Sequence, residues 1–237
     1  MNKWVLVTGA AKRIGRATAL GLAKSDWNVV IHYNRSQAAA MKLADEIKSL
    51  GRKVLLAEID LLNLKLVQNL IPSLNAEIGP LSALVNNASL FELDENDPDG
   101  SQHMTINAEA PRLLSEVFCQ QISTENTGVI VNLLDSCTPS KGFHAYIRSK
   151  QALKAQTLKM ALQCGPKVRI NGVAPGPVFP GLRESVAHFE SLYLSTPLRA
   201  QVKPENITAT ISFLIENSSI TGEIIHTDSG AHLLHRA

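Results

Sequence analysis

The chain has 237 residues, a length that suits one large α/β domain with a sizeable core. Its 23 lysines and arginines nearly balance its 21 aspartates and glutamates, and a net charge of +2 gives little attraction for nucleic acid. No stretch approaches the roughly 18 apolar residues that span a bilayer. We therefore expect a globular protein whose partners include neither nucleic acid nor a membrane.

The N-terminal residues and the cysteines bear on the compartment. A short apolar run at residues 4–7 begins almost at once, and it is too short for a signal peptide. Cys119, Cys137 and Cys164 are an odd number without C-x-x-C spacing, which predicts neither a disulfide framework nor a thiolate zinc site. We expect a cytoplasmic protein.

Short runs rich in β-branched residues alternate with longer amphipathic stretches along the whole chain. The runs predict buried parallel strands at Trp4–Val7, Asn28–Tyr33, Lys53–Ile59, Ser82–Val85, Gly128–Leu134 and Val168–Val173, with a seventh near Glu223–Thr227. The stretches predict helices at residues 14–25, 37–50, 63–78, 101–123, 144–164 and 204–216. Such alternation requires right-handed crossovers, so we expect residues 1–237 to form a single-domain doubly wound parallel sheet, a Rossmann fold, with about seven strands and helices on both faces.

The connection after the sixth strand, at residues 175–203, is long for a link between a strand and a helix. We expect it to form a lid over the substrate. His188, Phe189 and Tyr193 are candidates for contacts that exclude water, and packing within the lid is the alternative.

A turn that contains two glycines follows the first strand and opens a helix. Residues 8–17 read T-G-A-A-K-R-I-G-R-A, in which Gly9 permits a tight turn and Gly15 permits close packing of helix on strand. This context predicts that the turn binds the pyrophosphate of a dinucleotide, with an ordinary connecting turn as the alternative.

The end of the second strand indicates which dinucleotide binds. The sequence Tyr33-Asn34-Arg35-Ser36 lacks the acidic residue that would accept from a free ribose 2′-hydroxyl. Arg35, Ser36 and Arg13 offer charge-assisted hydrogen bonds to a 2′-phosphate. The sequence therefore favours NADPH over NADH, with solvated surface residues as the alternative.

Tyr146 and Lys150 stand four residues apart on a predicted helix, so they share one face. A phenol, whose reference pKa is about 10, becomes a better proton donor beside a cation. The pair suits proton transfer to an atom that is being reduced.

Six motifs in order resemble the short-chain dehydrogenase/reductase family over essentially the whole chain. They are the Thr8–Gly15 turn, Asp60, Asn86-Asn87-Ala88, Asn107, Tyr146 with Lys150, and Pro175-Gly176. The resemblance implies that Asp60 holds the adenine and that Asn86 braces the cofactor segment. It implies that Lys150 binds the nicotinamide ribose, that Asn107 seats a water linking Lys150 to solvent, and that Tyr146 donates the proton. Together with the residues above, the cofactor contacts that we expect are Gly9, Arg13, Ile14, Gly15, Tyr33, Asn34, Arg35, Ser36, Asp60, Asn86, Ala88, Tyr146, Lys150, Pro175 and Gly176.

The family usually places a serine at the end of the fifth strand. Aligned on Asn132, that position here is Asp135, and Ser136 could fill the role only by a register shift that reverses its side chain. A partly desolvated carboxyl beside a phenol can hold a proton and donate it to a ring nitrogen, which suits a nitrogen-rich substrate. The segment between Asp135 and Tyr146 is shorter than is usual in the family.

Asp135 and three further features resemble the pteridine reductase branch. Arg13 stands where most relatives have glycine, the second strand ends in H-Y-N-R-S, and the fourth strand leads into Ser89-Leu90-Phe91. The resemblance implies that Phe91 stacks on a pterin, that Ser89 bonds its ring, and that Arg13 approaches both the cofactor phosphate and the pterin. A core role for Phe91 is the alternative.

The sequence thus predicts NADPH-dependent reduction of a 7,8-dihydropterin to the tetrahydro form, with dihydrofolate as a second candidate substrate. The resemblance implies hydride transfer to ring carbon C6 and a proton from Tyr146 to N5, tuned by Lys150 and Asp135. Two alternatives stay open. One is a ketoreductase of the same fold for a 3-oxoacyl thioester or small carbonyl, whose mark would be serine at position 135, and the other is a non-catalytic NADP-binding sensor.

The resemblance also implies a homotetramer built on the helices around residues 101–123 and 144–164. The apolar candidates for that interface are Leu113, Leu114, Val117 and Phe118.

Seven histidines raise the question of a metal site. Only His232 and His235 have ligand-like spacing, and in the sequence no cysteine or carboxylate accompanies them. We therefore expect no metal.

Overall fold

The structure is a computed structural model that describes residues 3–123, 126–136, 141–180 and 185–235. Its centre is one sheet with the strand order β3-β2-β1-β4-β5-β6-β7, in which every neighbouring pair is parallel. This order confirms the predicted doubly wound Rossmann sheet. The strands are β1 (Trp4–Val7), β2 (Asn28–Tyr33), β3 (Val54–Glu58), β4 (Ala83–Asn86), β5 (Gly128–Leu133), β6 (Val168–Pro175) and β7 (Ile224–Thr227).

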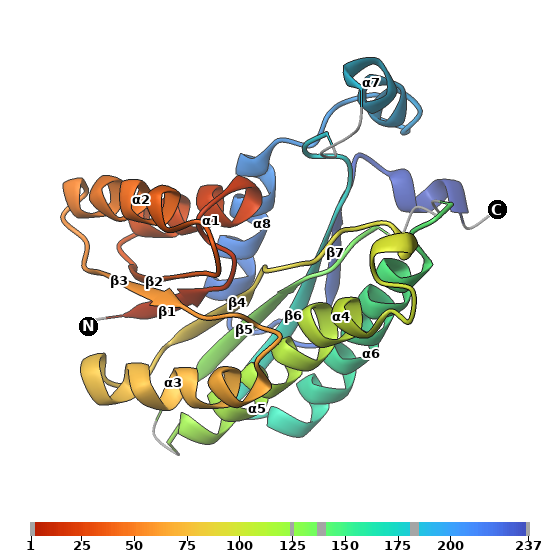
Figure 1. The fold of residues 1–237 in the computed structure, drawn as a ribbon. Coiled ribbons are helices and arrows are strands. Elements are labelled where there is room, and N and C mark those ends of the chain that lie inside the picture. The colour runs from red at the N-terminus through yellow and green to blue at the C-terminus, as the bar shows by residue number, and fades with distance from the viewer. Residues whose placement is uncertain (1–2, 124–125, 137–140, 181–184, 236–237) are drawn as a thin grey trace.

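Helices cover both faces of the sheet, as Figure 1 shows. On one face lie α1 (Arg13–Lys24), α2 (Gln37–Ser49) and α8 (Pro204–Glu216). On the other lie α3 (Leu64–Ile78), α5 (Ala110–Gln121) and α6 (His144–Cys164). The shorter elements are η1 (Asp94–Asn96), α4 (Ser101–Met104), η2 (Thr105–Glu109), α7 (Val186–Leu194) and η3 (Ala231–His235).

Strand β1 shows why the central strands read as continuous apolar runs. Alternate side chains of a strand point to opposite faces, and here both faces are covered. Val5 and Val7 lie in the core under α1, α2 and α8, whereas Trp4 and Leu6 lie in the core under α3 and α5. All four are buried, so a polar residue on such a strand needs a specific partner.

Two segments differ from the sequence prediction. The predicted helix 101–123 contains a π-helical turn, η2, with Asn107 in its middle. Such turns insert an extra residue and often mark functional positions. Within the predicted lid, residues 186–194 form α7, whose N-cap Ser185 accepts a hydrogen bond from the His188 amide. The weak periodicity of that stretch did not predict this helix.

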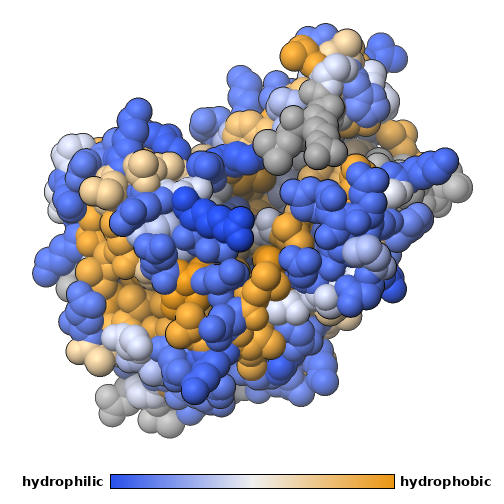
Figure 2. Space-filling model, in the orientation of Figure 1, coloured by the Kyte–Doolittle hydropathy of each residue, from blue (hydrophilic) through white to orange (hydrophobic). Residues whose placement is uncertain are grey.

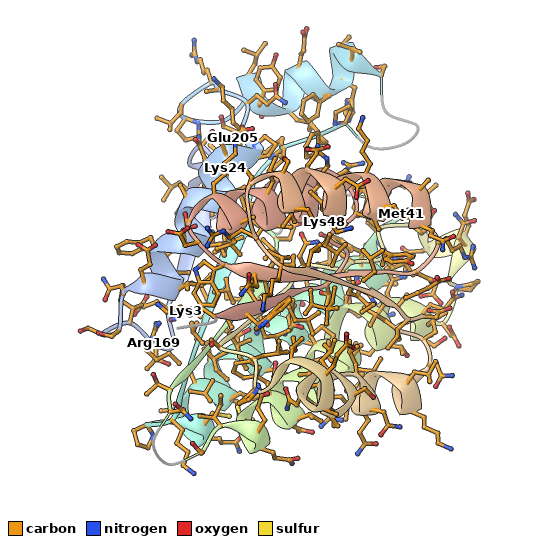
Figure 3. All side chains as sticks on the ribbon, turned by 90° about the vertical axis from the view of Figure 1, so that its left-hand side faces the viewer. Lys3, Lys24, Met41, Lys48, Arg169 and Glu205 are labelled. Atoms are coloured by element: carbon orange, nitrogen blue, oxygen red, sulfur yellow. The ribbon has the colours of Figure 1, made fainter. Side chains whose placement is uncertain are left out.

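Arg169 of β6, labelled in Figure 3, holds the carboxyl end of α8. Its guanidinium donates to the carbonyls of Leu214 and Ile215 in the last turn and of Ile220 beyond it. The Leu214 and Ile215 carbonyls lie in the last turn, beyond which the helix has no amides to pair with them, so the arginine acts as a C-cap. These three hydrogen bonds fix the end of α8 to β6. Helix α8 packs on the same face of the sheet as α1.

The tetramer prediction needs correction at the positions that it named. Leu114 and Phe118 are fully buried in the core, and Leu113 and Val117 are partly buried against it, because α5 turns this side toward the sheet. The exposed apolar side chains of α6 are Leu158, at 42% exposed, and Leu162, at 88%.

The surface carries apolar side chains near the open edge of the sheet. Leu56 of the edge strand β3, and Leu62 and Leu66 after it, are exposed. Figure 2 shows an apolar area between the places that α2 and α3 occupy in Figure 1. Among the described residues, no helix has the length and apolar character that crossing a bilayer requires.

Candidate active site

The turn between β1 and α1 depends on two glycines. Gly9 has φ +62°, a left-handed conformation, and a Cβ there would lie 2.9 Å from the Ala88 Cα. A Cβ at Gly15, in the first turn of α1, would overlap the Gly9 carbonyl oxygen. The turn can therefore pack against Ala88 and the start of α1 only with glycine at both positions.

Thr8 and Asn87 tie this turn to the end of β4. The Thr8 hydroxyl accepts from the Asn87 and Ala88 amides at 2.9 and 3.0 Å. The Asn87 side-chain amide donates to the carbonyls of Thr8 and Gly9 at 2.7 and 3.2 Å. Because β1 and β4 flank the point where the strand order reverses, these bonds build the crevice in which doubly wound folds bind ligands.

His32 of β2 holds the turn between β1 and α1 by a hydrogen bond. Its Nδ1 accepts from the Gly9 amide at 3.0 Å, and its Nε2 lies 3.1 Å from the Ile59 carbonyl, which it meets as a donor. Burial lowers the pKa of His32 from 6.5 to about 4, although the Ile59 carbonyl and Asp60 oppose this. His32 is therefore neutral at pH 7. Asp60 itself is half-buried and accepts from the Leu62 amide.

The first turn of α1 fits a pyrophosphate. No side chain caps it and no acidic residue lies in it, so the partial positive charge of the helix N-terminus is not neutralised by the protein. Ala10 and Ala11 are buried and small, and Ile14 is half-buried beside them. These features suit the dinucleotide that the sequence predicts.

The residues predicted to choose the dinucleotide lie at the end of β2. Tyr33 is buried and donates to the Glu58 carboxylate at 3.1 Å, and burial together with Glu58 raises the pKa of Tyr33. Asn34 and Arg35 are exposed and Ser36 is half-buried. The end of β2 thus presents a cation and two neutral polar side chains, with no acid among residues 33–36.

Arg13 links the phosphate turn to the predicted lid. It has φ +53°, unusual for a residue with a side chain. Its guanidinium donates to the carbonyls of Phe179 and Pro180 at 3.4 and 3.2 Å and lies 5.1 Å from the centre of the Phe179 ring. Arg13 therefore joins the glycine turn to residues 179 and 180 of the predicted lid, and its two predicted roles stay predictions.

Tyr146 lies in the first turn of α6, and its hydroxyl donates to the Asp135 carboxylate. Ser136, the alternative partner, is buried, and its backbone amide donates to the Pro175 carbonyl. Asp135 and not Ser136 thus contacts the phenol. Residues 137–140 between them, including Cys137, lie outside the described part of the chain.

Lys150 lies one turn after Tyr146 and is only 3% exposed. Its ammonium donates to the Leu133 carbonyl at 2.9 Å and lies 5.8 Å from the centre of the Tyr146 ring. A buried cation near a phenol stabilises the phenolate that remains after proton transfer.

Asn107 connects the segment after β4 to α6. Its side chain accepts from the Leu90 amide at 2.7 Å and donates to the Leu90 carbonyl and the Ser149 hydroxyl. Ser149 in turn donates to the Tyr146 carbonyl. The Asn107 side chain thus positions the backbone on both sides of the site, and the water that the resemblance assigns to it stays a prediction.

Asn86 anchors the centre of the sheet. Its side-chain Nδ2 donates to the side-chain Oδ1 of Asn132 at 2.8 Å and to the Ser115 hydroxyl, and the side-chain Nδ2 of Asn132 donates to the Thr157 hydroxyl. All four residues are buried. This network joins β4 and β5 to α5 and α6, and so braces the segments that flank the site.

The rings of Phe91, Phe143 and Tyr146 contact one another and form a cluster that we call the aromatic wall. The Phe91 and Phe143 rings are stacked at 4.5 Å with 7° between planes, and the Tyr146 ring meets Phe91 edge-on at 4.8 Å. Phe91 is 50% exposed, so it is not a core residue. Ser89 is exposed beside it. The wall thus places a half-exposed aromatic ring in edge contact with the Tyr146 ring.

The segment 92–104 holds this wall in place. Asp94 accepts from the His144 and Ala145 amides at the start of α6, and the Ala145 bond is the main cause that holds its pKa below the usual range. Behind it, His103 donates through Nδ1 to Asp97 at 2.6 Å. Both members of this pair are buried.

Pro175 and Gly176 end β6 beside β7. The Gly176 amide donates to the Thr227 carbonyl, and a Cβ at Gly176 would lie 2.7 Å from the Asp228 Cα, so only glycine fits. The residues predicted to contact substrate from the lid differ in their exposure. Phe189 is buried and meets Tyr193 edge-on at 5.6 Å, which is packing within α7, whereas His188 is exposed. Residues 181–184 lie outside the described part.

The family model for short chain dehydrogenases matches residues 3–191. This chain therefore belongs to the short chain dehydrogenase family. The FolM alternative dihydrofolate reductase 1 of Brucella canis, solved with NADP, is 33% identical with a TM-score of 0.91, over 98% of this chain and 94% of that one. An acetoin dehydrogenase of Enterobacter cloacae is 27% identical with a TM-score of 0.88, over 98% and 96%. The 3-oxoacyl-[acyl-carrier-protein] reductase FabG of Staphylococcus aureus is 26% identical over 98% of this chain and 99% of its own length.

Three supports of this short chain dehydrogenase site were not predicted from the sequence. The role of His32 could have been inferred from the sequence, because it is a polar residue inside a mostly apolar strand that follows the predicted phosphate turn. The roles of Phe143 and Asp94 could not, because Phe143 reaches Phe91, and Asp94 reaches the start of α6, only through the fold.

Proposed function

We propose that this oxidoreductase is an NADPH-dependent pteridine reductase that converts a 7,8-dihydropterin to the tetrahydropterin, with dihydrofolate as a second substrate. The observation that carries the proposal is the hydrogen bond from the Tyr146 hydroxyl to the Asp135 carboxylate. In the ketoreductases that the chain resembles, a serine hydroxyl stands at this position.

The difference between a carboxylate and a hydroxyl decides which substrate is favoured. Reduction of a ketone builds negative charge on the carbonyl oxygen, and a hydroxyl stabilises that charge by donating to it. The Asp135 carboxyl group, which accepts from Tyr146, does not offer the serine hydroxyl that would donate to this oxygen. A pterin instead presents N–H groups and basic nitrogens, to which a carboxyl group can accept or donate. Asp135 therefore favours a nitrogen heterocycle over a ketone.

Proton delivery falls to Tyr146. When bound, NADPH supplies the hydride to C6 of the dihydropterin. The Tyr146 hydroxyl gives its proton to the adjacent N5, which balances the two-electron reduction. The buried ammonium of Lys150, 5.8 Å from the Tyr146 ring, compensates the phenolate charge until solvent returns a proton.

The aromatic wall supports a flat substrate. Phe91 stacks on Phe143 at 4.5 Å and is half exposed, so the rest of its surface is available to a planar ring. The Tyr146 ring meets Phe91 edge-on at 4.8 Å. A heterocycle stacked there would present its ring nitrogens to Tyr146 and Asp135.

The cofactor preference rests on the end of β2. Arg35 and Ser36 can bind a 2′-phosphate, and the strand end carries no acid for a free 2′-hydroxyl. The similarity to FolM of Brucella canis, solved with NADP, supports both the cofactor and the pteridine substrate. The similarity to FabG keeps the ketoreductase as the second candidate.

We also propose a homotetramer through α5 and α6, in which the exposed Leu158 and Leu162 of α6 would be covered. Light scattering of the purified protein measures the assembly. A monomer would contradict this proposal without affecting the chemistry.

The test is NADPH oxidation with dihydrobiopterin, dihydromonapterin and dihydrofolate, run beside an acetoacetyl thioester. We expect turnover on the pterins alone. Asp135→Ser is the matched variant and should lose pterin turnover while it gains some on the thioester. Turnover only on the thioester would replace the substrate but leave the fold and cofactor intact. Cofactor binding without turnover on any substrate would favour the sensor.

A further inference from the structure

His226, Asp228 and His232 form a cluster outside the site described above. His226 lies in β7, Asp228 directly follows that strand, and His232 lies in η3. One potential ligand atom of each lies within 4.8 Å of those of the other two. By sequence spacing, the candidate pair is His232 with His235, with no carboxylate beside them. The fold instead brings Asp228 and His226 to His232. The side chain of His235 lies outside the described part.

The distances suit a small divalent cation. The Asp228 Oδ2 lies 2.8 Å from the His232 Nδ1 and 3.8 Å from the His226 Nδ1. Two ligands about 2.0 Å from one tetrahedral ion are separated by about 3.3 Å, a value between these two. The Asp228 side chain is 1% exposed, and those of His226 and His232 are 20% and 22% exposed, so solvent reaches the cluster from the histidine side.

The cap of η3 explains only part of this arrangement. Asp228 accepts from the Gly230 and His232 amides, which accounts for its position before η3. It does not require a second imidazole, yet the His226 ring is stacked on His232 at 4.0 Å with 24° between planes. Both Nδ1 atoms thus approach one buried carboxylate, a donor set of the kind that holds Zn²⁺.

We propose that this cluster binds one Zn²⁺ ion through the Nδ1 atoms of His226 and His232 and the Asp228 carboxylate. The ion replaces the proton between His232 and Asp228, and the neutral imidazole then carries its proton on Nε2. Rotation of each ring about χ2, a soft torsion, turns the two lone pairs onto the ion. Water takes the fourth position on the solvent side.

Because of its position, an ion bound to the cluster would stabilise the segment that follows β7. Ser229, next to Asp228, accepts from the Leu198 amide and donates to the Ala200 carbonyl, and both partners belong to the segment after α7. The Gly176 backbone packs on Asp228 from the other side. An ion at Asp228 therefore stabilises the strand end on which the end of the predicted lid rests.

The experiment is a Co²⁺ titration of tag-free, reduced protein, followed by visible absorption, with Zn²⁺ displacement as the second reading. We expect one equivalent of Co²⁺ with nitrogen and oxygen ligands. His226→Gln and His232→Gln should each weaken binding by at least about tenfold, whereas His188→Gln, an exposed histidine elsewhere, should not. This proposal does not rest on the pteridine reductase function, because no activity is measured.

Two results would overturn the site. One is the absence of a one-equivalent transition in the wild-type protein. The other is binding that both histidine variants retain, or that shows a thiolate charge-transfer band from Cys119 or Cys164, which lie close together. Asp228 also caps η3, so Asp228→Asn could unfold this region. The two histidine variants keep the bonds from the Gly230 and His232 amides to Asp228, so each should still unfold cooperatively without metal.

Discussion

In the proposed catalytic half of the site, on β4, β5, η2 and α6, key side chains are fixed by buried hydrogen bonds, whereas in the proposed adenosine half, at the ends of β2 and β3, burial ranges from the buried Tyr33 to the exposed Asn34 and Arg35. Asn86, Asn107 and Lys150 are each buried and bonded to protein partners. Asn34 and Arg35 are exposed. The proposed catalytic half is therefore held by protein contacts alone, whereas Asn34 and Arg35 leave their side chains open to solvent.

This difference follows from what each half must do. Proton transfer requires donor and acceptor to be placed within a few tenths of an ångström, which only packed and bonded residues achieve. Recognition of a phosphate at the protein surface requires charge and reach, which a long exposed side chain provides. Changes in the catalytic half should therefore cost rate and stability, and changes at the adenosine end should cost affinity alone.

The largest effect is expected from Tyr146→Phe. Loss of the proton donor should lower kcat by roughly a hundredfold to ten-thousandfold, because a positioned general acid contributes about that much. Steady-state kinetics with a dihydropterin measures the loss, and NADPH binding followed by fluorescence should be unchanged. Retained turnover would mean that another group delivers the proton.

His32 should make stability depend on pH in the range below neutrality. Its pKa is about 4 in the folded chain and 6.5 when exposed, so the folded state binds fewer protons. Stability is fully present above pH 6.5 and falls as the pH drops toward 4, by about 3 kcal/mol in total. Urea unfolding at a series of pH values measures this slope.

The matched variant for this prediction is His32→Gln, which can still accept from the Gly9 amide but does not titrate. It should flatten the slope, whereas His188→Gln, at an exposed position, should leave it in place. An unchanged slope in His32→Gln would assign the pH dependence to other groups.

Asn107→Ala should reduce both stability and rate. It leaves the Leu90 amide and carbonyl without their side-chain partner in a partly buried region, at a cost of about 2 kcal/mol in the free energy of unfolding. Because Phe91 follows Leu90, the aromatic wall should shift, and kcat should fall. A loss of stability with unchanged kcat would limit Asn107 to a structural role.

The smallest effect is expected at the adenosine end. Arg35→Ala should lower the preference for NADPH over NADH by about tenfold, or roughly 1.4 kcal/mol, by removing one charged hydrogen bond to the 2′-phosphate. Stability should not change, because Arg35 is exposed. Lys42→Ala, an exposed cation on α2, is the control. Equal losses in both variants would indicate a general charge effect.

The parallel sheet and the order of its strands and helices follow from patterns along the chain. Apolar runs that alternate with amphipathic stretches allow few packings other than a parallel sheet covered on both faces, and all seven strands lie at the predicted positions to within a few residues. The spacing of Tyr146 and Lys150 likewise put both on one helical face. These features depend on local periodicity, which a sequence displays directly.

The tertiary structure alone decided which residues from distant segments meet. Asp94 reaches the start of α6 across 51 positions, and Gly9 meets His32 across 23. The π-helical turn at Asn107 and the meeting of His226 with His232 also arise from packing. Periodicity sets the direction of a side chain relative to its own element, but the separation between two elements depends on the whole core, and so partners of this kind appear only once the chain is folded.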